Sequence, residues 1–269
     1  FFNEEYEKAA AAFDGYASAY PATSETPQAV YQKGYAHEIL GEYERAAAAF
    51  GDVATRFPQH GLVAEALYRA GENLYNASHF EEALVEYLRT VDDHAGAEPA
   101  PKALYSAGWT YMDLDREEDS LAAMRRLVDE YPGSGFARYA QFSIGDYYYS
   151  KKRFLDARGA YEKVVRLFPG TEEASKAQAL LGDVEEDLAS RAYESAFEHF
   201  QRGDYTTAAD GFEAIYEQYP SSYSALAALA NKGVALEHLG NSDEARRTYE
   251  RLIAASSGGG DADDISNFA

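Results

Sequence analysis

The sequence contains no cysteine and no long apolar run, and each absence excludes a class of protein. Without cysteine, this span cannot form disulfides, use a thiolate nucleophile, hold a cysteine-based zinc site or carry a lipid on cysteine. No stretch approaches the roughly 18 apolar residues that a membrane-spanning helix needs. We therefore expect no direct membrane span within these 269 residues.

Basic residues are also scarce. The chain carries 24 Lys and Arg against 46 Asp and Glu, a net charge of −22. A nucleic-acid groove needs clustered cations, so the composition argues against nucleic acid as a partner, and the acidic excess repels anionic membrane surfaces. The local exception is a basic cluster made of Lys151, Lys152, Arg153, Arg158, Lys163 and Arg166. We interpret this cluster as a solvated face, with docking of an acidic partner as the alternative.

Catalytic and metal-binding motifs are missing as well. The six histidines are scattered, and none forms an HExxH pair. Gly258-Gly259-Gly260 lacks the Lys-Ser/Thr that would hold a phosphate, and no nucleophile-elbow sequence is present. The sequence therefore predicts a protein that is not an enzyme and that uses no metal and no cofactor.

What the sequence does contain is a period of 37 residues. The period is marked by five glycines, Gly34, Gly71, Gly108, Gly145 and Gly182. The same spacing recurs in two further sets of residues. One set, with small side chains, is Ala46, Ala83, Ser120 and Ala157 (the small set), and the other, with large side chains, is Phe50, Tyr87, Met124 and Tyr161 (the large set). A fixed period of this length in helical sequence is typical of stacked repeats that bind a partner along an extended surface.

Each period predicts a pair of helices. In residues 26–60, two apolar stripes at helical spacing are separated by Gly41 and ended by Pro58. Glycine inside a helix costs about 1 kcal/mol relative to alanine, so we expect the second helix to cross close to each repeat glycine. We expect the small set to face these glycines and the large set to reach the next repeat. Ser78 and Asp115, each followed three residues later by glutamate, predict N-terminal caps of second helices.

Two irregularities determine the predicted organisation. Ala9, Phe13 and Pro21 match the second-helix pattern, so we expect the partner helix, and further repeats, upstream of this chain. Pro169 and Pro220 are 51 residues apart, 14 more than one period, and this excess is nearly four helical turns. The predicted segments are the second helix of a truncated repeat (1–21), four hairpins (22–171), a long connecting helix (172–202), C-terminal hairpins (203–255) and a flexible tail (256–269).

The pattern resembles the tetratricopeptide repeat. One repeat matches at Leu104, Ala107, Gly108, Tyr111, Ser120, Met124, Leu127 and Pro132, and the next matches at equivalent positions from Gln141 to Pro169. The loops at 131–134 and 219–222 are similar to those of bacterial outer-membrane-associated members, of the barrel-assembly lipoprotein and Tol–Pal coordinator types. The resemblance implies an all-α fold, a right-handed α-solenoid of antiparallel helix pairs, and a periplasmic or outer-membrane-associated location.

The resemblance also implies that the first helices line a concave groove. The predicted groove residues are Tyr31, Tyr35, Glu38, Tyr68, Glu72, Tyr75, Tyr105, Trp109, Met112, Phe142, Asp146, Tyr149, Tyr193, Phe197 and Phe200. Rings with interspersed carboxylates favour a neutral to basic protein or peptide segment. Packing between helices is the alternative interpretation of the same aromatic positions.

Together these patterns predict an interaction scaffold in a bacterial envelope assembly, acting within a multi-protein complex. Two alternatives share the same repeat physics. One is a cytosolic adaptor or regulatory module, and the other is a glycan-binding repeat protein of polysaccharide secretion. An enzyme is the least favoured class, because no nucleophile, base or metal set converges in the sequence.

Overall fold

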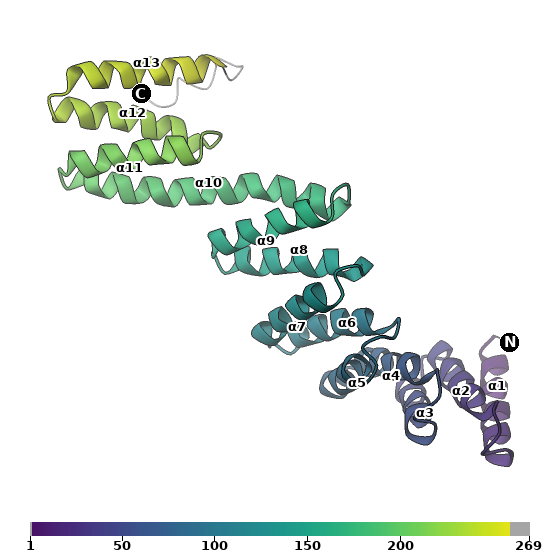
Figure 1. Cartoon of the computed structure of the whole chain (residues 1–269). Coiled ribbons are helices and arrows are strands. Elements are labelled where there is room, and N and C mark those ends of the chain that lie inside the picture. The colour runs from purple at the N-terminus through teal and green to yellow at the C-terminus, as the bar shows by residue number, and fades with distance from the viewer. Residues whose placement is uncertain (1, 259–269) are drawn as a thin grey trace. The chain divides into compact units, whose positions relative to one another are not determined.

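The structure, a computed structural model, describes residues 2–258 and contains helices and turns but no strand over that range. The helices, shown in Figure 1, are α1 (Phe2–Ala19), α2 (Thr26–Ile39), α3 (Tyr43–Arg56), α4 (Val63–Asn76), α5 (Phe80–Asp93), α6 (Ala100–Asp113), α7 (Glu117–Glu130), α8 (Gly135–Ser150), α9 (Phe154–Leu167), α10 (Glu172–Gln201), α11 (Tyr205–Gln218), α12 (Tyr223–His238) and α13 (Ser242–Gly258). The predicted all-α fold of paired helices is confirmed. A single helix of 30 residues, α10, occupies the segment for which the sequence predicted a long connecting helix.

The chain forms two compact units that divide within α8, one up to Ile144 and the other from Gly145 onward. In the first unit each helix from α1 to α7 packs on the next, and α4 also contacts α6. In the second unit α9 to α13 pack in chain order, and α10 also contacts α12. The contacts that skip one helix show that first helices, such as α4 and α6, lie side by side within a unit.

A recurring left-handed turn joins the first helix of each pair to the second. Its left-handed residues are Gly41, Ser78, Asp115, Lys152, Gly203 and Gly240, with φ between 56° and 80°. The amide three residues past the end of the helix bonds back into it; His79 N donates to Leu74 O at 2.8 Å. This bond satisfies a terminal carbonyl of the first helix. The turn therefore repeats with the same 37-residue spacing as the sequence, in two series.

The predicted caps at Ser78 and Asp115 are wrong. Both residues end a first helix in the left-handed conformation, while the residues that begin α5 and α7, His79 and Arg116, make no side-chain cap bond. Serine and aspartate favour helix N-termini, and aspartate also tolerates the left-handed region. The residue types alone therefore did not distinguish the two ends of this short turn.

The close crossing at the repeat glycines is confirmed, with a different partner from the one expected. A Cβ built on Gly71 would lie 2.7 Å from the Tyr87 ring, and one on Gly34 would lie 2.9 Å from the Phe50 ring. The residue against each glycine is thus the large one sixteen positions later, rather than the small residue of the second helix. Phe50 also belongs to a buried cluster with Ala66 of the next repeat, so the large residue serves both contacts.

Two other expectations need correction. Gly182 lies on the 37-residue grid, but no other side chain lies within 4 Å of a Cβ built there. Gly233, which is off that grid, instead packs against Tyr249 as the repeat glycines do. Helix α13 continues to Gly258, so residues 256–258 of the predicted tail are helical, and residues 259–269 of that tail lie outside the described residues.

Candidate binding surface

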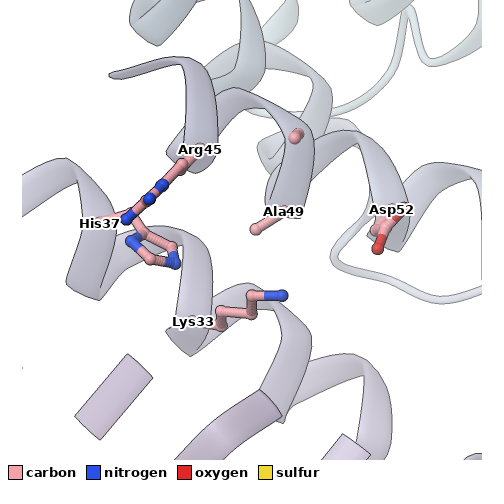
Figure 2. A pocket seen from close by; sticks show the side chains of 6 residues that line it. Lys33, His37, Arg45, Ala49 and Asp52 are labelled. Carbon is pink, nitrogen blue, oxygen red and sulfur yellow. The ribbon is translucent and has the colours of Figure 1, made fainter. Parts of the chain in front are cut away.

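One pocket in the described residues lies away from the predicted groove. It is an open pocket of about 380 Å³ lined by Lys33, His37, Arg45, Ala48, Ala49 and Asp52 of α2 and α3 (Figure 2). Its basic groups are already paired: Lys33 with Asp14 at 2.5 Å, His37 with Glu42 at 2.6 Å and Arg45 with Glu42 at 3.0 Å. Within residues 2–258 no three His, Asp or Glu side chains are grouped to hold a metal ion. All three basic side chains of this pocket are therefore already paired with a carboxylate.

The first predicted groove position, three residues before each repeat glycine, packs inward. The Tyr31 ring lies 5.1 Å from Phe50, and the Tyr68 ring lies 6.0 Å from Tyr87. Burial raises the pKa of the Tyr68 hydroxyl, and the nearby Glu72 carboxylate adds to that rise. At these two positions the rings are part of the contact between the paired helices.

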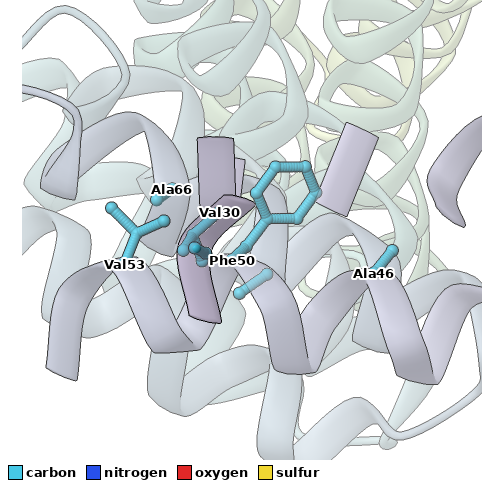
Figure 3. Packing of buried hydrophobic residues seen from close by; sticks show 7 residues of the cluster. Val30, Ala46, Phe50, Val53 and Ala66 are labelled. Carbon is cyan, nitrogen blue, oxygen red and sulfur yellow. The ribbon is translucent and has the colours of Figure 1, made fainter. Parts of the chain in front are cut away.

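The core beneath this face is continuous between repeats. Val30 of α2 lies against Phe50 and Val53 of α3, and Ala66 of α4 closes the cluster (Figure 3). All four side chains are buried. Phe50 packs directly against Gly34 and therefore sets the distance between α2 and α3. The same contact sets the position of the exposed residues of α2.

The second predicted position, one residue after each glycine, alternates along the chain between an aromatic and an acidic residue. Glu72 accepts a hydrogen bond from the Tyr87 hydroxyl at 2.6 Å, and Asp146 accepts one from Tyr161 at 2.7 Å. Where the large second-helix residue has no hydroxyl, the position holds an exposed ring instead.

These rings are Tyr35, in the repeat of Phe50, and Trp109, in the repeat of Met124. Tyr35 is 38% exposed and Trp109 is 46% exposed. The sequence reasoning missed this coupling, although an acid followed by tyrosine fifteen residues later was readable at Glu72 and again at Asp146.

The third predicted position, four residues after each glycine, connects neighbouring first helices. Glu38 accepts hydrogen bonds from Arg69 at 3.0 Å and Asn73 at 2.9 Å. The Tyr75 hydroxyl donates to Asp113 of α6 at 2.6 Å. That bond is the main reason why the pKa of Tyr75 is raised to about 12, and burial adds to it. These contacts fix the register of α2, α4 and α6.

In the first unit these contacts bring a set of predicted residues onto one strip. Ser106 of α6 donates to Glu72 at 3.1 Å, and Asp113 of α6 accepts from Tyr75. Trp109 lies three residues after Ser106 and four before Asp113, so it shares their face of α6. Met112 is exposed beside Asp113, at 38%. We call Tyr35, Glu72, Trp109, Met112 and Asp113 the first-helix face.

Tyr105 and Phe142 contribute less to that face. The Tyr105 ring lies 6.2 Å from Trp109 and 5.6 Å from Phe136, so it supports Trp109 from the side. Phe142 of α8 is half-buried. We therefore place Trp109, and not Tyr105, at the solvent side of this ring cluster.

The predicted residues of the second unit are engaged in packing. Phe197 stacks between Tyr193 at 6.0 Å and Phe200 at 5.9 Å. The hydroxyl of Tyr149 donates to Asp187 of α10 at 2.9 Å. Burial raises the pKa of the Tyr193 hydroxyl. The open aromatic area of the predicted set is therefore concentrated in the first unit.

One protein family matches this chain over almost its whole length. The sequence model of the outer membrane lipoprotein family YfiO matches residues 1–154 and again residues 143–252. The chain belongs to this family. Membership confirms the predicted outer-membrane-associated, periplasmic location and the resemblance to tetratricopeptide repeat proteins of the outer membrane. In keeping with the YfiO family, the chain is a protein-interaction scaffold.

Solved structures are similar in fold. A tetratricopeptide repeat protein from Parabacteroides merdae has a TM-score of 0.50 and 16% identity, over 86% of this chain and 80% of its own. MamA from Desulfovibrio magneticus has a TM-score of 0.47 and 24% identity, over 62% and 88%. The C-terminal part of a repeat protein from Cytophaga hutchinsonii has a TM-score of 0.47 and 14% identity, over 85% and 96%. No curated protein sequence matches the chain.

Within residues 2–258 each helix of this YfiO family member is too short or too polar to cross a bilayer.

Proposed function

We propose that the protein is a non-enzymatic scaffold that holds a segment of a partner protein on the first-helix face. The observation that carries this proposal is Trp109, the only tryptophan in the chain, which is 46% exposed on α6. Tyrosine and tryptophan contribute large, rigid contact areas and are enriched among the residues that dominate binding energy. Met112 extends this apolar area along the same helix.

The charges of the face favour a neutral to basic segment. The hydrogen bonds that Tyr87 and Ser106 donate to Glu72 both end on Oε1, so among the described residues Oε2 remains available as an acceptor. Asp113 places a second carboxylate beside Met112. A lysine or arginine next to an apolar residue would satisfy both parts of this surface. An extended strand rises about 3.3 Å per residue and could cross several first helices, which pack about 8–10 Å apart.

Trp109 makes the proposal directly measurable. A fluorescein-labelled 12-residue peptide that alternates lysine with leucine serves as the probe, and its anisotropy gives the affinity. Trp109→Ala should weaken binding about tenfold, which corresponds to about 1.4 kcal/mol. In the unmodified protein the single tryptophan's emission should shift to shorter wavelength when the peptide covers it.

The matched control is Tyr223→Ala. Tyr223 lies in the second unit and is 87% exposed, more than Trp109, so its removal tests whether any open ring binds the probe. Equal affinity of Trp109→Ala and the unmodified protein would move the binding site off the first-helix face. Tyr105→Ala is a poorer test, since loss of its contacts with Phe136 would also destabilise the fold.

A further inference from the structure

Helix α9 of the second unit carries a basic surface that the proposed function does not use. Lys163 and Arg166 are exposed on α9, and Lys152 is exposed in the turn before it. Leu155 and Leu167 of the same helix are 62% and 51% exposed. Positions 155, 163 and 166 follow the spacing that places residues on one face of a helix. We call Lys152, Leu155, Lys163, Arg166 and Leu167 the α9 basic face.

The internal repeat shows how unusual this face is. The positions of Leu155, Arg166 and Leu167 recur 37 and 74 residues earlier in α7 and α5. There they hold only acids: Glu118, Asp129 and Glu130 in α7, and Glu81, Asp92 and Asp93 in α5. The same structural positions thus change from three carboxylates to two leucines and an arginine.

The charge of the segment changes accordingly. Residues 151–167 carry six cations and two carboxylates, a net charge of +4, in a chain whose net charge is −22. Arg153 pairs with Asp156 at 2.8 Å, and Arg158 approaches Glu162 at 4.0 Å. Among the residues that the structure describes, Lys152, Lys163 and Arg166 form no ion pair.

We propose that the α9 basic face docks an acidic amphipathic segment of another protein. The two leucines would contact the apolar side of that segment, and Arg166 would form paired hydrogen bonds with a carboxylate, for which its planar guanidinium is suited. This inference does not depend on the first-helix face, which lies in the other unit and favours cations.

A protein segment explains the face better than an anionic lipid surface does. The part of the chain outside residues 151–167 carries a net charge of −26, which opposes approach to an anionic membrane. An extended anionic plane would also approach the carboxylates that surround this face. A single acidic helix is narrower than a membrane, and charges of the chain beyond about 8 Å from it are screened at physiological salt.

The test copies one repeat onto another. The variant Leu155→Glu/Arg166→Asp/Leu167→Glu gives α9 the residues that α7 already carries at these positions, so the fold should tolerate it. The probe is a fluorescein-labelled 20-residue helical peptide with leucine on one face and glutamate on the other. The variant should bind at least tenfold more weakly, and salt should weaken binding to the unmodified protein. A peptide with lysine in place of glutamate should bind the variant and the unmodified protein with equal affinity.

One control variant and one substitute for the triple variant make the test decisive. Val85→Glu replaces an apolar residue that is 55% exposed on α5 and should leave affinity unchanged. If circular dichroism shows that the triple variant is misfolded, Lys163→Glu/Arg166→Asp replaces it with the same expected loss. Equal binding by variant and unmodified protein would refute the proposal.

Two further results would replace the proposed occupant. The face would be assigned to lipid by three results together. The unmodified protein co-sediments with phosphatidylcholine vesicles containing one third phosphatidylglycerol, the variant does not, and the acidic peptide does not bind. A dimer in sedimentation equilibrium that the variant abolishes would assign it to a second copy of the chain.

Discussion

Gly71 of α4 and Gly182 of α10 lie on the same 37-residue grid, three periods apart, yet their surroundings are opposite. A Cβ on Gly71 would meet the Tyr87 ring at 2.7 Å, whereas no other side chain and no other helix lies within 4 Å of one on Gly182. Sixteen residues after Gly71 the chain has turned and α5 returns across α4. Sixteen residues after Gly182 the chain has reached Glu198, which is still within α10.

The comparison shows that the glycine alone does not predict a close crossing. Seven residues after Gly71, Ser78 adopts the left-handed turn that reverses the chain. The equivalent residue after Gly182 is Ala189, which is buried in the interior of α10. A close crossing therefore needs three features: a glycine, a left-handed residue seven positions later and a large residue sixteen positions later. Gly233, Gly240 and Tyr249 satisfy this rule off the main grid.

Leucine at the two glycines gives the largest expected difference. Gly71→Leu should lower the free energy of unfolding by about 3 kcal/mol, because the rigid Tyr87 ring must move to admit the new side chain. Gly182→Leu should instead raise it by about 0.5–1 kcal/mol, because leucine is the better helix former and the space is open. Urea denaturation followed by circular dichroism at 222 nm measures both. Similar losses for the two variants would contradict the contrast.

Much of the fold could be predicted from the sequence, because period and composition are local signals. The 37-residue spacing, the paired helices and the continuous helix after Pro169 all follow from apolar spacing and from proline. The partner of each repeat glycine was assigned wrongly to residues such as Ala46. Spacing shows that two positions face each other, but it does not show which side chain leans into the gap.

The candidate site was less predictable for a related reason. Glu72 and Trp109 occupy equivalent positions, one residue after a repeat glycine, but the second-helix residues fifteen positions later differ. Glu72 accepts a hydrogen bond from the Tyr87 hydroxyl, whereas Met124 has no hydroxyl and Trp109 is exposed. The chemistry at this position therefore depends on a residue fifteen positions away. A helical pattern read one helix at a time does not contain that information.

The Tyr87 ring packs against Gly71, and its hydroxyl should make the stability of the protein depend on pH. We expect this effect to be of intermediate size. Burial, and then the Glu72 charge, raise the pKa of Tyr87 in the folded state. Its contribution to stability is therefore complete below the unfolded value near 10 and is lost as pH rises above that value. The stability advantage of the unmodified protein over Tyr87→Phe should shrink by up to about 1.4 kcal/mol per pH unit above pH 10.

Urea midpoints between pH 8 and pH 11.5 for both proteins test this expectation. At pH 8, Tyr87→Phe should cost about 1 kcal/mol, because Glu72 loses its hydrogen bond from the hydroxyl. A difference between the two proteins that stays constant across the range would show that Tyr87 ionises as easily in the folded state as in the unfolded chain.

The smallest expected change in stability concerns the left-handed turn at Ser78, which follows Gly71 and has no counterpart after Gly182. Gly182 is a glycine with no structural need for one, whereas Ser78 fills a left-handed position, with φ of 65°, where glycine would fit better. A non-glycine residue there costs roughly 1–2 kcal/mol, and glycine's greater freedom in the unfolded chain offsets part of the gain. Ser78→Gly should therefore stabilise the protein by about 0.5–1 kcal/mol. Ala77→Gly, where φ is −81°, should destabilise it by a similar amount, and equal shifts in the same direction would show that the turn does not limit stability.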